Sequence, residues 1–175
     1  MNSFIRQLWA LCLLRTGPQD MPVTPQLATQ LVIALVLLQV GASLMLGADD
    51  ALAARMLLSV FLLVVPAWWL LGLKRTPERL PQTLTALAGT SLLISMIMLP
   101  LSALVIGLPP PTAETPPTGV QMFAALVTFA LLAWKLSIDT HIWRNALEVP
   151  RALAMALALV LFLGEIALNQ LFPGA

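Results

Sequence analysis

The 175-residue sequence contains no tyrosine, one histidine, one cysteine and few charges, with Asp, Glu, Lys and Arg making up only 10% of the chain. The single cysteine, Cys12, excludes an internal disulfide and a cysteine-based metal cluster. A net charge of +1 provides no basic surface that could hold phosphates, so we expect no nucleic-acid partner. The sequence has no phosphate-binding glycine-rich loop, HExxH or CxxC pattern. We therefore assign no catalytic residue, no metal ligand and no cofactor.

Apolar residues are abundant, at 59% of the sequence. Soluble proteins carry about a quarter charged residues, and a chain of this composition could not bury so much apolar surface in water. The lipid bilayer is therefore the expected solvent and first partner. A helix needs about 20 apolar residues to cross a hydrocarbon core of ~30 Å. The sequence predicts an all-α membrane protein with five transmembrane helices, over residues 27–46, 51–73, 84–108, 120–138 and 152–171.

Residues 1–24 precede the transmembrane domain, which covers residues 25–175, and we expect them to form a cytoplasmic helix and linker. Residues 3–15 place Arg6 and Gln7 in a polar stripe on an otherwise apolar helix. Because this helix is too short to span, we expect an interfacial amphipathic helix in the plane of the membrane. The alternative is a helix packed on the rest of the protein. Thr24-Pro25 is a typical start for the first spanning helix.

The loops predict the orientation of the chain. Cationic residues cluster before the first span, between the second and third, and around the last turn: Arg6, Arg15, Lys74, Arg75, Arg79, Lys135, Arg144 and Arg151. The positive-inside rule then places the N-terminus in the cytoplasm and the C-terminus in the periplasm. We expect the five tryptophans at the same cytoplasmic interface: Trp9, Trp68, Trp69, Trp134 and Trp143. The Ala- and Leu-rich composition favours a bacterial inner membrane.

Glu165 is the main candidate for a functional residue, because it lies inside the last predicted span, where an unpartnered charge is costly. Arg55 lies at a similar depth and could pair with it. Asn169 and Gln39 are further polar candidates within the spans. Three interpretations are open: a pair with Arg55, separate snorkelling of both side chains to polar surroundings, and a proton or ion relay through Glu165.

The last turn contains a second polar group, Asp139, His141, Arg144 and Glu148. These residues could form an acid–base cluster or a weak metal site. An ordinary polar turn is the favoured interpretation. Lys135 and Asp139 are four residues apart, a spacing that predicts an ion pair at the end of a helix.

Two runs in the last hairpin carry a family resemblance: Ala133-Trp134-Lys135 through Trp143-Arg144-Asn145-Ala146, and Pro150-Arg151-Ala152-Leu153-Ala154. Together with the amphipathic N-terminal helix, the proline-containing linker and five closely spaced spans, they resemble the Yip family of small membrane proteins. The resemblance implies that family's fold and a role in membrane organisation. The chain lacks the tyrosine-containing signature and long acidic N-terminus of the eukaryotic members, which bind Rab-type GTPases, so GTPase binding is not carried over.

These observations predict a non-enzymatic integral membrane protein that acts as a membrane-organising scaffold or accessory subunit. The first alternative is a small transporter or channel subunit that uses Glu165. The second is a membrane-embedded enzyme, which would need an acid–base pair at one interface. A second copy of the chain or another membrane protein is a further candidate partner.

Overall fold

The computed structural model describes residues 2–46, 52–109, 111–112 and 116–170, and every regular element in these ranges is helical. The α-helices are α1 (Asn2–Cys12), α2 (Pro25–Leu46), α3 (Leu52–Leu73), α4 (Leu80–Val105), α5 (Gly119–Leu147) and α6 (Arg151–Gln170). Two short 3-10 helices lie in the connections, η1 (Pro18–Asp20) and η2 (Pro77–Arg79). The all-helical architecture agrees with the prediction from sequence.

Four helices are long and apolar enough to cross a membrane: Pro25–Met45, Ala54–Leu73, Pro77–Val105 and Gly119–Leu147, within the described residues. This is consistent with an integral membrane protein. Helix α6 coincides with the fifth predicted span, and its crossing of the membrane stays a prediction.

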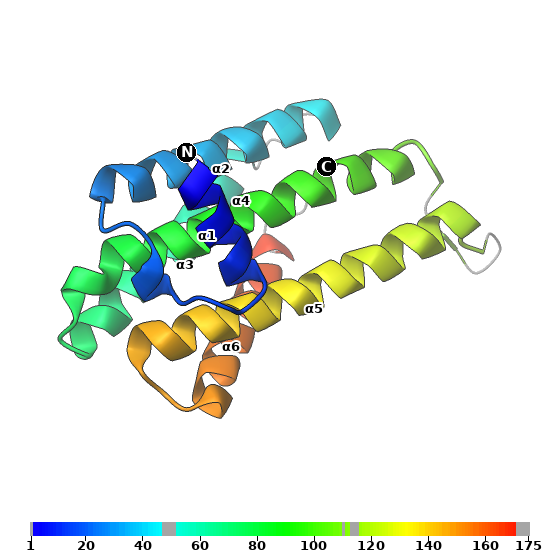
Figure 1. The fold of residues 1–175 in the computed structure, drawn as a ribbon. Helices are drawn as coiled ribbons and strands as arrows, with labels where there is room; N and C mark the ends of the chain where they lie inside the picture. Colours follow the sequence, from blue (N-terminus) through cyan, green and yellow to red (C-terminus); the bar gives the residue numbers. More distant parts are fainter. Residues whose placement is uncertain (1, 47–51, 110, 113–115, 171–175) are drawn as a thin grey trace.

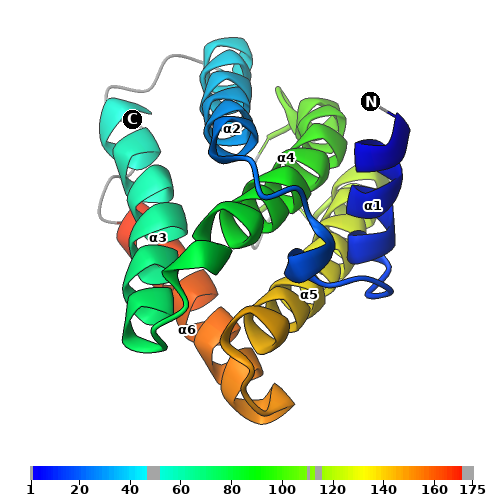
Figure 2. The ribbon, with the colours of Figure 1, turned by 60° about the vertical axis from the view of Figure 1, so that its left-hand side comes forward.

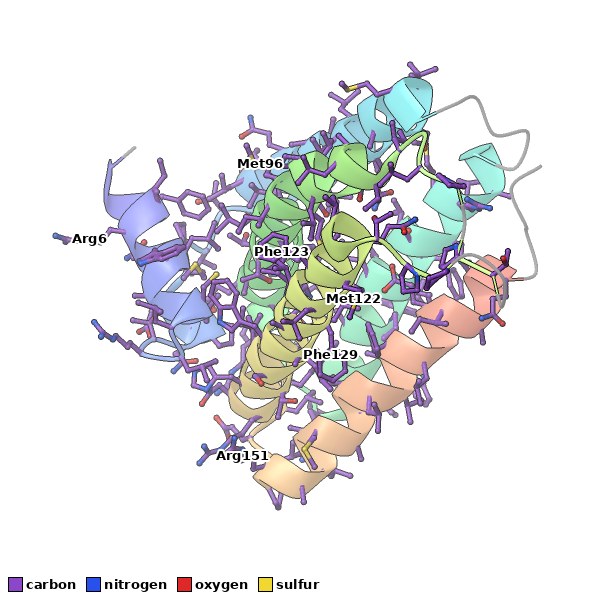
Figure 3. All side chains as sticks on the ribbon, turned by 90° about the vertical axis from the view of Figure 1, so that its right-hand side faces the viewer. Arg6, Met96, Met122, Phe123, Phe129 and Arg151 are labelled. Atoms are coloured by element: carbon purple, nitrogen blue, oxygen red, sulfur yellow. The ribbon has the colours of Figure 1, made fainter. Side chains whose placement is uncertain are left out.

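The outward-facing surface of the bundle is largely apolar. Leu57 and Phe129 are 74% and 73% exposed, respectively. Figure 3 shows Met96, Met122 and Phe123 on the face formed by α4 and α5, whereas Arg6 projects away from the bundle on α1. Exposed apolar surface of this extent would not be stable in water, and lipid is the solvent that it fits.

Helix α4 is the centre of the bundle and contacts α1, α2, α3 and α5 (Figure 2). Its first half is rich in small and hydroxyl-bearing residues, including the buried Thr85, Ala86, Gly89 and Thr90. A Cβ atom added at Gly89 would lie 2.9 Å from a Leu8 methyl group, so this glycine lets α1 approach closely. Gly41 of α2, by contrast, faces open space within the described structure.

Helix α5 is longer than the predicted span 120–138, because it continues without a break to Leu147. It begins in a capping box, in which the Gln121 backbone N–H donates to Thr118 Oγ1 (3.3 Å) and the Thr118 backbone N–H donates to Gln121 Oε1 (2.8 Å). It ends where Glu148 takes the left-handed conformation (φ 51°), shortly before Pro150. The polar residues after position 138 do not end the helix, since neither glycine nor proline follows until Pro150.

The N-terminal segment is docked on α4 and α5, and α1 crosses these helices at a steep angle (Figure 1). Leu8, Leu11 and Cys12 are buried against the bundle. The structure therefore shows the packed helix that the sequence allowed as an alternative. Ile5 and Trp9 remain exposed on α1, and an in-plane position at the membrane interface stays a prediction.

Hydrogen bonds from α4 and α5 hold the backbone of this segment. Trp134 Nε1–H donates to the Cys12 carbonyl oxygen (3.0 Å), and His141 Nε2–H donates to the Thr16 carbonyl oxygen (2.9 Å). Gln82 Nε2 donates to the carbonyl oxygens of Gln19 (2.9 Å) and Met21 (3.0 Å). The Trp134 ring also meets Trp9 edge to face, with ring centroids 6.3 Å apart. Trp134, expected at the membrane interface, is thus held by contacts within the protein.

The three cationic segments of the sequence meet at one end of the bundle, called here the loop end (Figure 1): the linker 13–24, the connection 74–79 and the turn region 144–151. Arg79 Nη2 pairs with Glu148 Oε1 at 2.6 Å and joins two of them. Their shared end agrees with the predicted threading, whereas the assignment of that end to the cytoplasm stays a prediction. Trp143, expected at the membrane interface, is instead buried in the core at 2% exposure.

Candidate functional site

A cavity of about 330 Å³ with a partly polar wall lies between the five long helices α2 to α6. Each helix contributes at least one polar side chain to its wall. These residues are Gln39 of α2, Ser59 of α3, Ser91 and Ser95 of α4, Lys135 and Asp139 of α5, and Glu165 of α6. The remaining wall is apolar. Because five separate helices supply the polar groups, the cavity is a feature of the whole bundle.

Each of the five helices places one polar side chain of this cavity at a similar depth, whereas Asp139 lies nearer the loop end, about 12 Å along α5. At 1.5 Å per residue, Glu165 is about 21 Å along α6 from the loop end, and Gln39 is about 21 Å along α2. Ser59 lies about 21 Å from the loop end of α3, and Lys135 about 18 Å from the end of α5. A bilayer core of ~30 Å has its midplane about 15 Å from either edge. The polar level is therefore deep within the bundle.

Lys135 and Asp139 form an ion pair on the cavity wall. The Lys135 ammonium lies 2.5 Å from both carboxylate oxygens of Asp139, and the two side chains are only 17% and 23% exposed. The predicted pair is confirmed, but its predicted position at a helix end is wrong. Because α5 extends to Leu147, the pair lies inside the helix and faces the cavity.

Glu165 lines the cavity and is exposed on the protein surface. Lys135 and Asp139 line the same cavity. With both acids ionised, the cavity holds one positive and two negative charges. Since Asp139 already pairs with Lys135, Glu165 contributes a second carboxylate to the cavity.

No protein-family model, curated protein or solved structure matches the chain in the comparisons made. The resemblance to the Yip family accordingly stays a prediction from the residue pattern.

The remaining intramembrane candidates lie around the cavity. Gln39 lines it, as Glu165 does. Arg55 lies one turn along α3 from Ser59, farther from the loop end. Its pairing with Glu165 stays a prediction. The side chain of Asn169 lies outside the described residues.

The second predicted group, the polar residues Asp139, His141, Arg144 and Glu148 of the last turn, does not form one cluster. Three of its members each contact a different partner. Asp139 pairs with Lys135, and Glu148 pairs with Arg79. His141 holds the N-terminal linker, and a carbonyl oxygen can only accept, so Nε2 of this histidine carries a proton. Arg144 is exposed at the loop end. Within the described ranges, no group of three His, Cys, Asp or Glu side chains is placed to hold a metal ion.

Sequence reasoning missed Lys135 and the three serines as site residues. Two signals could have found them. Ser91 and Ser95 are four residues apart and therefore share one face of α4. In addition, counting residues inward from the loop end puts polar residues of five helices at one level, which a helix-by-helix inspection does not reveal.

Proposed function

We propose that the chain is a small membrane transport protein, or a subunit of one, that binds a small polar solute in the cavity enclosed by the five helices α2 to α6. The observation that supports this proposal is the convergence of polar side chains from five helices at one depth. Polar groups inside a bilayer are costly and usually mark pathways for ions or solutes. Binding sites of membrane transporters commonly lie near the midplane, between helices.

The charges of the cavity favour a cationic solute. Glu165 adds a second, exposed carboxylate to the cavity, and an ammonium group or a proton can neutralise it. The Ser91 and Ser95 hydroxyls and the Gln39 amide provide neutral hydrogen-bonding groups on the same cavity wall. We propose that Glu165 receives the cation and that the neutral groups replace part of its hydration shell.

The scaffold function expected from the sequence does not require such a cavity. A purely structural bundle would be expected to fill the space with apolar side chains, since each buried polar group reduces stability unless it is hydrogen-bonded. No observation on the described residues favours the enzyme alternative over transport. We therefore rank transport first and keep the scaffold as the outcome to be excluded.

Reconstituted liposomes test the proposal. We expect the purified protein to carry radiolabelled methylammonium, or protons detected by an entrapped pH dye, across the membrane. Glu165→Gln should remove most of this flux. Glu148→Gln is the matched control, because Glu148 is an exposed acid outside the cavity. Absence of both fluxes from the native protein, or an unchanged flux after Glu165→Gln, would support the scaffold instead.

A further inference from the structure

A second pocket lies at the loop end, with no residue in common with the cavity between the helices. Its volume is about 420 Å³. It is lined by polar side chains from the linker, η2 and the end of α5, which are Gln19, Arg79, Arg144, Asn145 and Glu148, and by Val149. The pocket is thus formed where the three cationic segments meet.

Arg79 is held in place on one side of this pocket. Its Nη2 pairs with Glu148 Oε1 at 2.6 Å, and its Nη1 donates to the Ala146 carbonyl oxygen at 3.4 Å. A guanidinium group carries five N–H donors, so these two contacts leave donors for a further acceptor. Only about a third of the Arg79 side chain is exposed, whereas Glu148 is 70% exposed. Arg79 is therefore the more firmly held residue of this ion pair.

Arg144 supplies a second guanidinium from the last turn of α5. Among the described residues it forms no ion pair. With one carboxylate and two guanidinium groups, the pocket has a net charge of +1. The excess cation needs a counter-ion, and the planar donor pairs of arginine match the oxygens of a phosphate group better than a lysine would.

We propose that this pocket binds a phosphate group between Arg79 and Arg144. The pocket lies at the loop end of helices that can span a membrane, where lipid phosphates are found. The headgroup of an anionic phospholipid is therefore the expected ligand. A soluble phosphate compound offers the same chemistry and is distinguished by experiment.

Binding can be measured on the full chain in detergent by native mass spectrometry, with phosphatidylglycerol, phosphatidylcholine and inorganic phosphate as separate probes. We expect phosphatidylglycerol to be retained more strongly than phosphatidylcholine. Arg144→Gln should weaken its retention at least about tenfold, the loss expected for hydrogen bonds to a charged group. Arg151→Gln is the matched control, since Arg151 is exposed near the same turn but outside the pocket (Figure 3).

A variant of opposite sign keeps the test independent of folding defects. Glu148→Gln removes the only carboxylate of the pocket and should strengthen phosphatidylglycerol retention, whereas damage to the fold would weaken it. Binding of inorganic phosphate that depends on Arg144, without lipid selectivity, would assign the pocket to a soluble phosphate compound. Equal losses in Arg144→Gln and Arg151→Gln, or no binding of any probe, would overturn the proposal.

Discussion

Removal of Lys135 should destabilise the protein more than removal of Asp139, although the two residues form one ion pair. Lys135→Met leaves Asp139 and Glu165 in the same cavity without a cation. Asp139→Asn leaves Lys135 with Glu165, which lies on the same cavity and can serve as the new counter-ion. Glu165 can therefore replace Asp139 as the counter-ion of Lys135, whereas, among the described residues, no second cation lines the cavity to replace Lys135.

The size of the difference follows from the burial of the pair. Breaking a buried pair by removing one partner costs about 3–5 kcal/mol, because an uncompensated charge remains. The Asp139 side chain is 23% exposed, so we expect about 3 kcal/mol for Lys135→Met, the lower end of that range. For Asp139→Asn we expect about 1 kcal/mol, the net value of the hydrogen bonds that the amide does not replace. The double variant should be more stable than Lys135→Met alone.

Unfolding by SDS in mixed micelles, followed by tryptophan fluorescence, gives the free energies of unfolding for the four proteins of this cycle. Ser137→Ala is the control, because Ser137 is exposed on the same helix. Equal losses for the two single variants, or additive losses in the double variant, would show that Glu165 does not act as a reserve counter-ion.

Three further predictions concern other parts of the chain. Gly89→Leu should displace α1, because even a Cβ atom at this position meets Leu8 at 2.9 Å. Faster proteolysis of the N-terminal segment would detect the displacement, and Gly72→Leu, at an open site, is the control. Burial raises the pKa of the Cys12 thiol, with Lys135 acting in the opposite direction, so less thiolate is present at pH 8. Maleimide should therefore label the folded protein much more slowly than the SDS-unfolded protein, and equal rates would contradict the burial of Cys12. In a Cys12→Ser background, Thr112→Cys should react with an impermeant thiol reagent applied to intact cells, whereas Glu78→Cys at the loop end should not; the reverse pattern would invert the orientation.

Much of the fold could be predicted from the sequence because the bilayer limits helix length and composition. The bounds of α2, α3 and α6 lie within about two residues of the predicted spans, a common uncertainty at helix ends. The main difference lies in α5, where Asp139 and His141 resemble a polar turn. Their polarity is satisfied by Lys135 and by the Thr16 carbonyl oxygen, and the second of these partners is 125 residues away. Tertiary contacts of this range are not visible in a local pattern.

The candidate site was predicted in part, for a related reason. Glu165 and Gln39 were identified because each is polar within an apolar run. Lys135 was assigned to a helix end, since the predicted span stopped at residue 138. Once α5 is extended to Leu147, the same lysine moves to the depth of Glu165 and the cavity becomes apparent. The error in the predicted end of α5 therefore concealed Lys135 as a residue of the site.

The bonds that hold the N-terminal segment also set an order for biogenesis. Cys12 and Trp134 are joined by a hydrogen bond across 122 residues, and His141 reaches Thr16 across 125. At synthesis rates of about 5–20 residues per second, α1 is made roughly 6–24 s before its anchors on α5 exist. During this interval the exposed Ile5 and Trp9 give α1 an apolar surface that the bilayer can accept. Helix α1 thus waits for its contacts with α5 long after it is made, and a nascent chain halted before Trp134 would carry it unanchored by α5.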